Sequence, residues 1–211
     1  MSMRKADYIK TKIIKWLIES HLSFNVLRDA IGSEVLFSTG RRKADILILS
    51  RKFHALEIKG DFDTLRKLKG QLSDYHKTFD KVSIVTTPKH LSKIRQIIKP
   101  NTGLILFDQD DIRIIKRAKT QKKLDKRSLL MFLPKKELLR LLKIRSKKSY
   151  IGQIRNNVTN KLTGKAIRKA AYQFLLRQHK ENFNLFLKDI GDSIPIDELK
   201  GLSGKIDKLS I

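Results

Sequence analysis

The chain contains no cysteine, which rules out a disulfide framework and a zinc ribbon. Its five histidines show no spacing typical of zinc ligands. No apolar run approaches the roughly 20 residues of a membrane-spanning helix, and the basic opening lacks the apolar centre of a signal peptide. We therefore expect a soluble, cytoplasmic protein that has no membrane partner.

Acidic residues are scarce relative to basic ones. The chain has 21 Asp plus Glu against 47 Lys plus Arg, a formal net charge of +26. This exceeds the roughly 2 to 8 charges that keep a small domain soluble, so the natural partner is a polyanion such as nucleic acid. Residues 112–181 carry 22 Lys plus Arg and three acids, so +19 of the charge lies in that segment.

Hydrophobic periodicity predicts an α/β protein. We expect an amphipathic helix over residues 6–18 and a helical turn over residues 25–30 that ends at Gly32. Three strands, a helix with Asp63 as its N-cap, and a buried strand in a parallel crossover should follow. A further helix and strand complete this part. The strands are expected at 34–37, 44–49, 53–58, 82–85 and 103–107, and the helices at 63–79 and 91–98.

Two regions are expected from the shift in charge. Residues 1–111 would form the α/β core, and residues 112–211 a basic, mainly helical region that binds nucleic acid. Pro134 can open a helix in the second region. A longer helix is expected over residues 161–188, with basic residues along the side opposite its apolar stripe. These are Lys165, Arg168, Lys169 and Arg177.

Asp45, Glu57 and Lys59 stand at the ends of two neighbouring strands. A hairpin brings the start of its first strand beside the end of its second, so the three side chains should converge. Alternation places Glu57 and Lys59 on one face. Two carboxylates beside an ammonium suit a metal-dependent phosphodiesterase, because a hard cation prefers oxygen ligands and a cation can orient the attacking water.

The order of these residues resembles the PD-(D/E)XK nuclease superfamily, and among its members the small bacterial and phage proteins. The resemblance covers roughly residues 30–90 and rests on Glu34, Asp45, the run Glu57-Ile58-Lys59, and the pair Gln71 and Tyr75 on the following helix. The spacing Gln-x-x-x-Tyr is similar to that of RecB-like nucleases. Ala44 stands where the family often has proline.

The resemblance implies a restriction-endonuclease-like αβββαβ core with a mixed sheet, and a magnesium-dependent deoxyribonuclease of a bacterial or phage-infected cell. Asp45 and Glu57 would bind Mg²⁺, or Mn²⁺ in its place, with the backbone carbonyl of Ile58, and Lys59 would serve the attacking water. Glu34 matches an additional acidic ligand, for which Glu19 competes. Gln71 and Tyr75 would join the catalytic set, although Tyr75 also fits the apolar stripe of its helix.

Several alternatives stay open at this point. Phosphate contacts are expected from Arg41, Arg42 and Lys43 and from Lys165, Arg168 and Lys169, yet solvated residues would show the same pattern. A nuclease-like fold could instead bind nucleic acid or a protein partner without turnover, as a phage accessory or regulatory protein. A third alternative, an RNA-associated basic protein, would explain the positive charge but not the grouping of Asp45, Glu57 and Lys59. DNA is preferred over RNA. A homodimer is allowed, and endonuclease or exonuclease action is undecided. His54 and His76 are expected at the surface.

Overall fold

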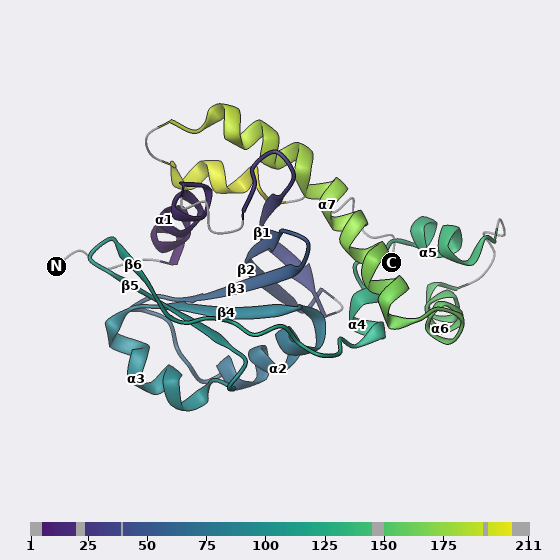
Figure 1. The fold of residues 1–211 in the computed structure, drawn as a ribbon, viewed down its shortest axis with the longest axis horizontal. Helices are drawn as coiled ribbons and strands as arrows, with labels where there is room; N and C mark the ends of the chain where they lie inside the picture. Colours follow the sequence, from purple (N-terminus) through teal and green to yellow (C-terminus); the bar gives the residue numbers. More distant parts are fainter. Residues whose placement is uncertain (1–5, 20–23, 39, 145–149, 192–193, 204–211) are drawn as a thin grey trace.

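The computed structural model describes residues 6–19, 24–38, 40–144, 150–191 and 194–203. Within them, seven α-helices accompany one open, mixed sheet of six strands (Figure 1). The strands are β1 (Ala30–Phe37), β2 (Arg42–Leu49), β3 (Phe53–Lys59), β4 (Lys81–Thr86), β5 (Gly103–Asp108) and β6 (Asp111–Lys116). The helices are α1 (Ala6–Glu19), α2 (Leu68–Thr78), α3 (Pro88–Ile97), α4 (Lys126–Leu130), α5 (Lys135–Leu142), α6 (Ile151–Lys161) and α7 (Gly164–Asp189), followed by the 3-10 helix η1 (Ile196–Lys200). No helix of the described segments is long and apolar enough to cross a membrane.

The strands lie in the sheet in the order of the sequence. β1, β2 and β3 form an antiparallel meander, and α2 and α3 return the chain so that β3, β4 and β5 are parallel. The expected hairpin and parallel crossover are therefore confirmed. β6 was not expected, and it pairs antiparallel with β5 at the sheet edge. Three of its six residues are charged, and most of it is exposed.

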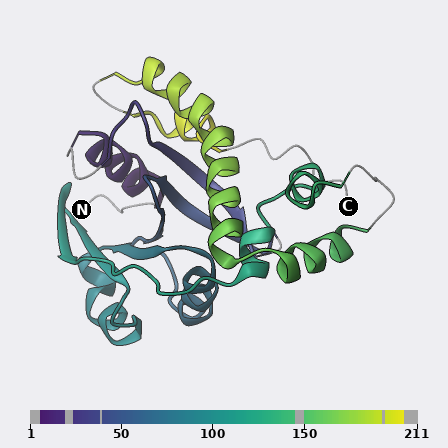
Figure 2. The same cartoon turned by 45° about the vertical axis from the view of Figure 1, so that its right-hand side comes forward.

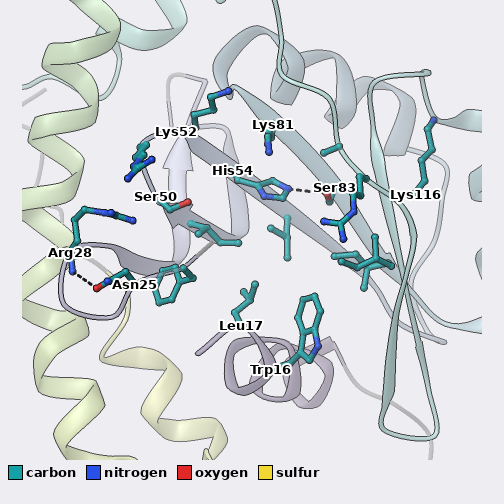
Figure 3. Close-up of a pocket in the computed structure, with 18 residues that line it drawn as sticks. Trp16, Leu17, Asn25, Arg28, Ser50, Lys52, His54, Lys81, Ser83 and Lys116 are labelled. Atoms are coloured by element: carbon teal, nitrogen blue, oxygen red, sulfur yellow. Dashed lines mark hydrogen bonds between the residues drawn. The ribbon is translucent and has the colours of Figure 1, made fainter. Parts of the chain in front are cut away.

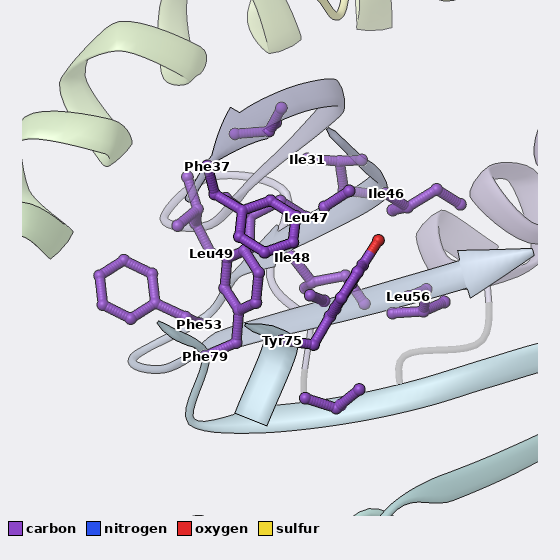
Figure 4. Packing of buried hydrophobic residues seen from close by; sticks show 14 of the residues in the cluster. Ile31, Phe37, Ile46, Leu47, Ile48, Leu49, Phe53, Leu56, Tyr75 and Phe79 are labelled. Atoms are coloured by element: carbon purple, nitrogen blue, oxygen red, sulfur yellow. The ribbon is translucent and has the colours of Figure 1, made fainter. Parts of the chain in front are cut away.

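Helices cover both faces of the sheet. α2 and α3 lie on one face and α1 on the other, while α7 runs across the β1 and β2 side (Figures 1 and 2). α5 and α6 lie beside the N-terminal half of α7, away from α1. On the α2 face, the rings of Phe37 and Phe79 lie 4.9 Å apart and the rings of Phe37 and Tyr75 lie 4.8 Å apart (Figure 4). This aromatic cluster fixes α2 against the strands that carry the candidate site.

Two local expectations were wrong. The expected helical turn is present, since the N–H of Asp29 donates to the carbonyl oxygen of Asn25, but Gly32 does not end it and lies inside β1. A Cβ at Gly32 would lie 2.8 Å from the imidazole of His179, so close packing against α7 requires glycine. α2 begins at Leu68 because Asp63 instead accepts a hydrogen bond from the N–H of Gly60 in the preceding turn.

The expected boundary between residues 111 and 112 falls inside β6. The helix expected from residue 161 is confirmed as α7, which begins at Gly164. It contacts β1, and its Arg168 is ion-paired with Asp80, which precedes β4, at 2.6 Å. Buried apolar residues of the sheet and of α4 to α7 belong to one hydrophobic cluster. The basic helices are thus packed onto the core.

Candidate functional site

The antiparallel register of β2 and β3 brings the predicted residues together. Ile46 pairs with Leu56, so Asp45 lies beside the end of β3, and its Oδ2 accepts a hydrogen bond of 2.6 Å from the backbone N–H of Ile58. Glu57 and Lys59 share a face of β3, and Lys59 Nζ lies 2.7 Å from Glu57 Oε1. The expected convergence of Asp45, Glu57 and Lys59 is present in the structure.

Glu57 is the centre of this cluster. Its side chain is buried, and both of its carboxylate oxygens have partners. Oε1 accepts a hydrogen bond of 2.8 Å from Gln71 Nε2 in addition to its ion pair with Lys59, and Oε2 lies 2.5 Å from the Tyr75 hydroxyl. Since Gln71 and Tyr75 are one helical turn apart, α2 presents both to the same carboxylate. α2 therefore fixes the orientation of Glu57.

Tyr75 belongs both to the aromatic core and to the polar cluster. Its ring packs between Phe37 and Phe79 in the core, and its hydroxyl reaches the polar cluster. The hydroxyl lies between Glu57 Oε2 and the carbonyl oxygen of Lys43, which is 3.0 Å away, and can donate to either. Burial, followed by the charges of Glu57 and Asp45, holds the pKa of Tyr75 well above its usual value. The phenol is therefore a hydrogen-bond donor at neutral pH.

The Asp45 carboxyl is electrostatically strained. Burial, and then the negative charge of Glu57, raise its pKa to about 7, against the hydrogen bond from Ile58 that acts to lower it. Like charges held close together out of water oppose ionisation. Asp45 is therefore partly protonated at neutral pH, and a cation placed between it and Glu57 would favour the ionised form.

Glu34 joins the cluster through an irregular point in β1. Ser33 pairs with Ile46 and Val35 with Ala44, which leaves Glu34 opposite Asp45, and the φ of Glu34 is +52°. Its carboxylate is ion-paired with Lys10 and lies 3.8 Å from Lys43 Nζ. Its charge also contributes to the raised pKa of Asp45.

Glu19, the competing candidate for the additional acid, lies at the end of α1. It is 3.6 Å from Lys15 on its own helix, and its side chain is 59% exposed. Nothing links it to Asp45 or Glu57 in the described structure. The structure therefore brings Glu34 to the cluster and does not bring Glu19.

Lys10 is the member of the site that sequence reasoning missed. It is buried on α1 and bonds to Glu34. Burial lowers its pKa, but the bond to Glu34 and the charges of Asp45 and Glu34 outweigh burial and the pKa is raised. The signal was present in the sequence, because Lys10 precedes Ile13, Ile14 and Leu17 by three, four and seven positions and so shares their buried stripe.

The predicted phosphate-binding residues differ in their surroundings. Arg168 is held by Asp80 and by the carbonyl oxygen of Arg51, so it ties α7 to the sheet. Arg42 is ion-paired with Asp74 of α2 at 3.0 Å. Four exposed cations remain on the two segments, and these are Arg41, Lys43, Lys165 and Lys169. Among the described residues, the only ion pair that any of them makes is the contact of Lys43 with Glu34 at 3.8 Å.

A ready-made metal centre is not present among the described residues, since no three His, Cys, Asp or Glu lie close enough to hold an ion. Asp45 and Glu57 remain as a pair of interacting carboxylates next to the backbone of Ile58. Lys59 is buried. His76 is also buried, against Thr102, contrary to the surface position expected for it.

The fold and site define a mixed α/β protein with a buried cluster of acids and lysines where the middle of β2 lies beside the end of β3. The chain belongs to the family of bacteriophage P4 protein cII, which matches residues 2–203. Protein cII of Enterobacteria phage P4 is 34% identical over 139 residues, which cover 64% of this chain and 51% of that protein. The chain thus spans about half the length of this curated relative.

One solved structure is also similar. It is SPO1766, a protein of unknown function from Silicibacter pomeroyi, at 18% sequence identity and a TM-score of 0.35. The match covers 50% of this chain and 69% of that one. At this TM-score the likeness does not identify the fold.

Proposed function

We propose that the chain is a metal-dependent nuclease of the PD-(D/E)XK type that hydrolyses DNA phosphodiester bonds in the cytoplasm of a phage-infected cell. The observation that carries the proposal is the convergence of Asp45, in the middle of β2, with Glu57 and Lys59 at the end of β3. The meander β1–β2–β3 followed by α2 and the parallel strand β4 supports a restriction-endonuclease-like core. Membership of a phage family is compatible with this setting.

The donor set fits a hard divalent cation. Asp45 and Glu57 supply carboxylate oxygens, and the mutual repulsion that raises the pKa of Asp45 would be relieved by a cation shared between them. Asp45, Glu57 and the backbone of Ile58 would hold Mg²⁺ together with water. Mg²⁺ bound there would polarise a phosphoryl oxygen and acidify a water molecule.

The remaining residues of the cluster position these groups. Gln71 and Tyr75 of α2 each donate a hydrogen bond to Glu57. These two bonds fix the plane of the Glu57 carboxylate. Lys59 places an ammonium on the same face of β3, where it can orient the attacking water and offset phosphate charge. Arg41, Lys165 and Lys169 are exposed and would hold the DNA backbone without reading sequence.

The test is a cleavage assay on supercoiled circular, linear duplex and single-stranded DNA, and on RNA, in EDTA, Mg²⁺ or Mn²⁺. Cleavage of the circle shows endonuclease action. Glu57→Gln keeps the size of the side chain and should remove cleavage, whereas Asp111→Asn, on the exposed edge strand β6, should keep it. The proposal fails if the wild type cleaves none of these substrates with either metal, or if Glu57→Gln retains wild-type activity.

A second function is favoured by one specific observation. Each acid of the cluster is already engaged: Glu34 by Lys10, Glu57 by Lys59, and Asp45 by the N–H of Ile58. Carboxylates whose oxygens are already engaged by groups of the protein suit a nuclease-like fold that binds DNA, or a partner protein on DNA, without cutting it. The same assay separates the two functions when DNA binding is measured beside it. Tight binding with no metal-dependent cleavage supports the second function.

A further inference from the structure

A cavity of about 670 Å³ lies on the α1 face of the sheet, apart from the acid cluster (Figure 3). Trp16 and Leu17 of α1 and Phe24 supply apolar surface on one side. On the other side, the sheet contributes His54 of β3 and Ser83 of β4. This volume lies within the roughly 300 to 1,000 Å³ of ordinary small-molecule sites.

The charge of the cavity wall has one sign. Six basic residues line it and, among the described residues, no Asp or Glu does. Arg28 is neutralised by Asp29 at 2.8 Å, but the other five have no ion pair with a described carboxylate. These five are Arg51, Lys52, Lys81, Lys116 and Arg117. Because uncompensated cations around a hollow of the surface concentrate anions, the cavity is suited to a ligand with several negative charges.

The sheet side of the cavity carries two uncharged polar side chains. His54 Nε2 and Ser83 Oγ lie 2.9 Å apart and form a hydrogen-bonded pair on neighbouring strands. The other ring nitrogen of His54 has no partner among the described residues. Burial, and then the nearby charge of Lys81, lower the pKa of His54 to about 4, so the ring is neutral at pH 7 and its other nitrogen offers a ligand a donor or an acceptor, according to the tautomer. Trp16 rises from α1 across the cavity from this pair (Figure 3).

We propose that this cavity binds a nucleoside polyphosphate, with the base against Trp16 and Phe24, its polar edge toward His54 and Ser83, and the phosphates toward Lys81, Arg51 and Arg117. Stacking on an aromatic face and cation contacts with phosphate are the interactions that such a ligand requires. A purely apolar ligand would leave the cations without a partner, and phosphate alone would leave the apolar wall uncovered. The proposal does not depend on nuclease activity.

The binding test uses the full chain in EDTA, so that metal at Asp45 and Glu57 plays no part. Trp16 is the one tryptophan of the chain, and its fluorescence therefore reports on this cavity. ATP should change the fluorescence in a saturable way. Adenosine, which lacks phosphate, and inorganic triphosphate, which lacks the base, should each bind at least about tenfold more weakly, since each can use only part of the site. Equal affinity for ATP and inorganic triphosphate would overturn the proposal.

Matched variants separate this cavity from the general positive charge of the protein. Lys81→Gln with Arg117→Gln should weaken ATP binding at least about tenfold, because two cations that face the phosphates are removed. Lys93→Gln with Arg95→Gln removes the same charge from exposed positions of α3 and should leave the affinity unchanged. Circular dichroism establishes that both variants fold. Equal losses of affinity in the two double variants would contradict the assignment.

The polar pair gives an independent variant. Ser83→Ala removes the hydroxyl partner of His54 and should weaken ATP binding while leaving the affinity for inorganic triphosphate as it was. An unchanged ATP affinity would overturn the placement of the base. A 5′-phosphorylated oligonucleotide added as competitor identifies the source of the ligand. Displacement of ATP supports a nucleotide at the end of a strand, and no displacement supports a free nucleotide.

Discussion

Asp45→Asn tests the electrostatics of the acid cluster directly. Burial and the charge of Glu57 raise the pKa of Asp45 from the ordinary 3.8 to about 7. The folded protein therefore holds this proton more tightly than the unfolded chain does. The resulting stability is fully present below pH 3.8 and is lost as the pH rises through about 7.

The size of the effect follows from the same shift. A difference of about three pKa units at about 1.4 kcal/mol each gives at most ~4 kcal/mol. Asp45 is partly exposed, and solvent screens part of this cost. Asn keeps an acceptor for the N–H of Ile58 and removes the charge. We therefore expect Asp45→Asn to raise the free energy of unfolding at pH 8 by about 2 kcal/mol and to change it little at pH 4.

Urea unfolding followed by circular dichroism at pH 4, 6 and 8 measures this difference. Asp111→Asn is the control, because the Asp111 side chain is 63% exposed. Saturating Mg²⁺ should then stabilise the wild type at pH 8 by about 2.7 kcal/mol at a hundredfold excess over Kd, and should not stabilise Asp45→Asn. If the difference between wild type and Asp45→Asn is the same at pH 4 and pH 8, the argument about Asp45 is wrong.

Three further predictions concern other parts of the chain. Arg168→Ala should lower the free energy of unfolding by about 2 to 4 kcal/mol, because Asp80 is buried and would lose its cation; urea unfolding measures it, and a decrease under about 0.5 kcal/mol contradicts the role as an anchor. Gly32→Ala should cost about 1 to 3 kcal/mol through overlap with an imidazole of α7, and an unchanged midpoint of thermal unfolding would refute this. Neutralising Lys165 and Lys169 together should weaken duplex binding equally for all sequences and lower the slope of log affinity against log salt by about 0.9 for each phosphate that these lysines neutralise; fluorescence anisotropy with an unchanged slope would show that α7 does not bind DNA.

The core of the site could be predicted from the sequence because it depends on local geometry. Alternation along β3 places Glu57 and Lys59 on one face, and the short turn at residues 50–52 fixes Asp45 beside them. The helical spacing of Gln71 and Tyr75 likewise fixed their shared direction. Their placement beside Glu57, which is 14 and 18 positions away, came from the family resemblance and not from local geometry.

The parts that were missed depend on contacts distant in sequence. Nothing local indicates that Arg168 would find Asp80, 88 positions away, instead of solvent. β6 has the exposed, charged sequence of an edge strand and so looked like the start of the basic region. The cavity requires α1, β3, β4 and the segment after β6 to meet, and its charge is visible only once they do.

β3 connects the two sites. Its residues alternate between faces, so Glu57 and Lys59 face α2 and the acid cluster, whereas His54 and Leu56 face α1 and the cavity. A shift of its register by one residue would exchange the two sets, so both sites require the same pairing with β2 and β4. Because the two sites lie on opposite faces, a variant of one is a control for the other. Glu57→Gln should leave nucleotide binding unchanged, and Ser83→Ala should leave DNA cleavage unchanged. A variant that removes both functions has disturbed β3 itself.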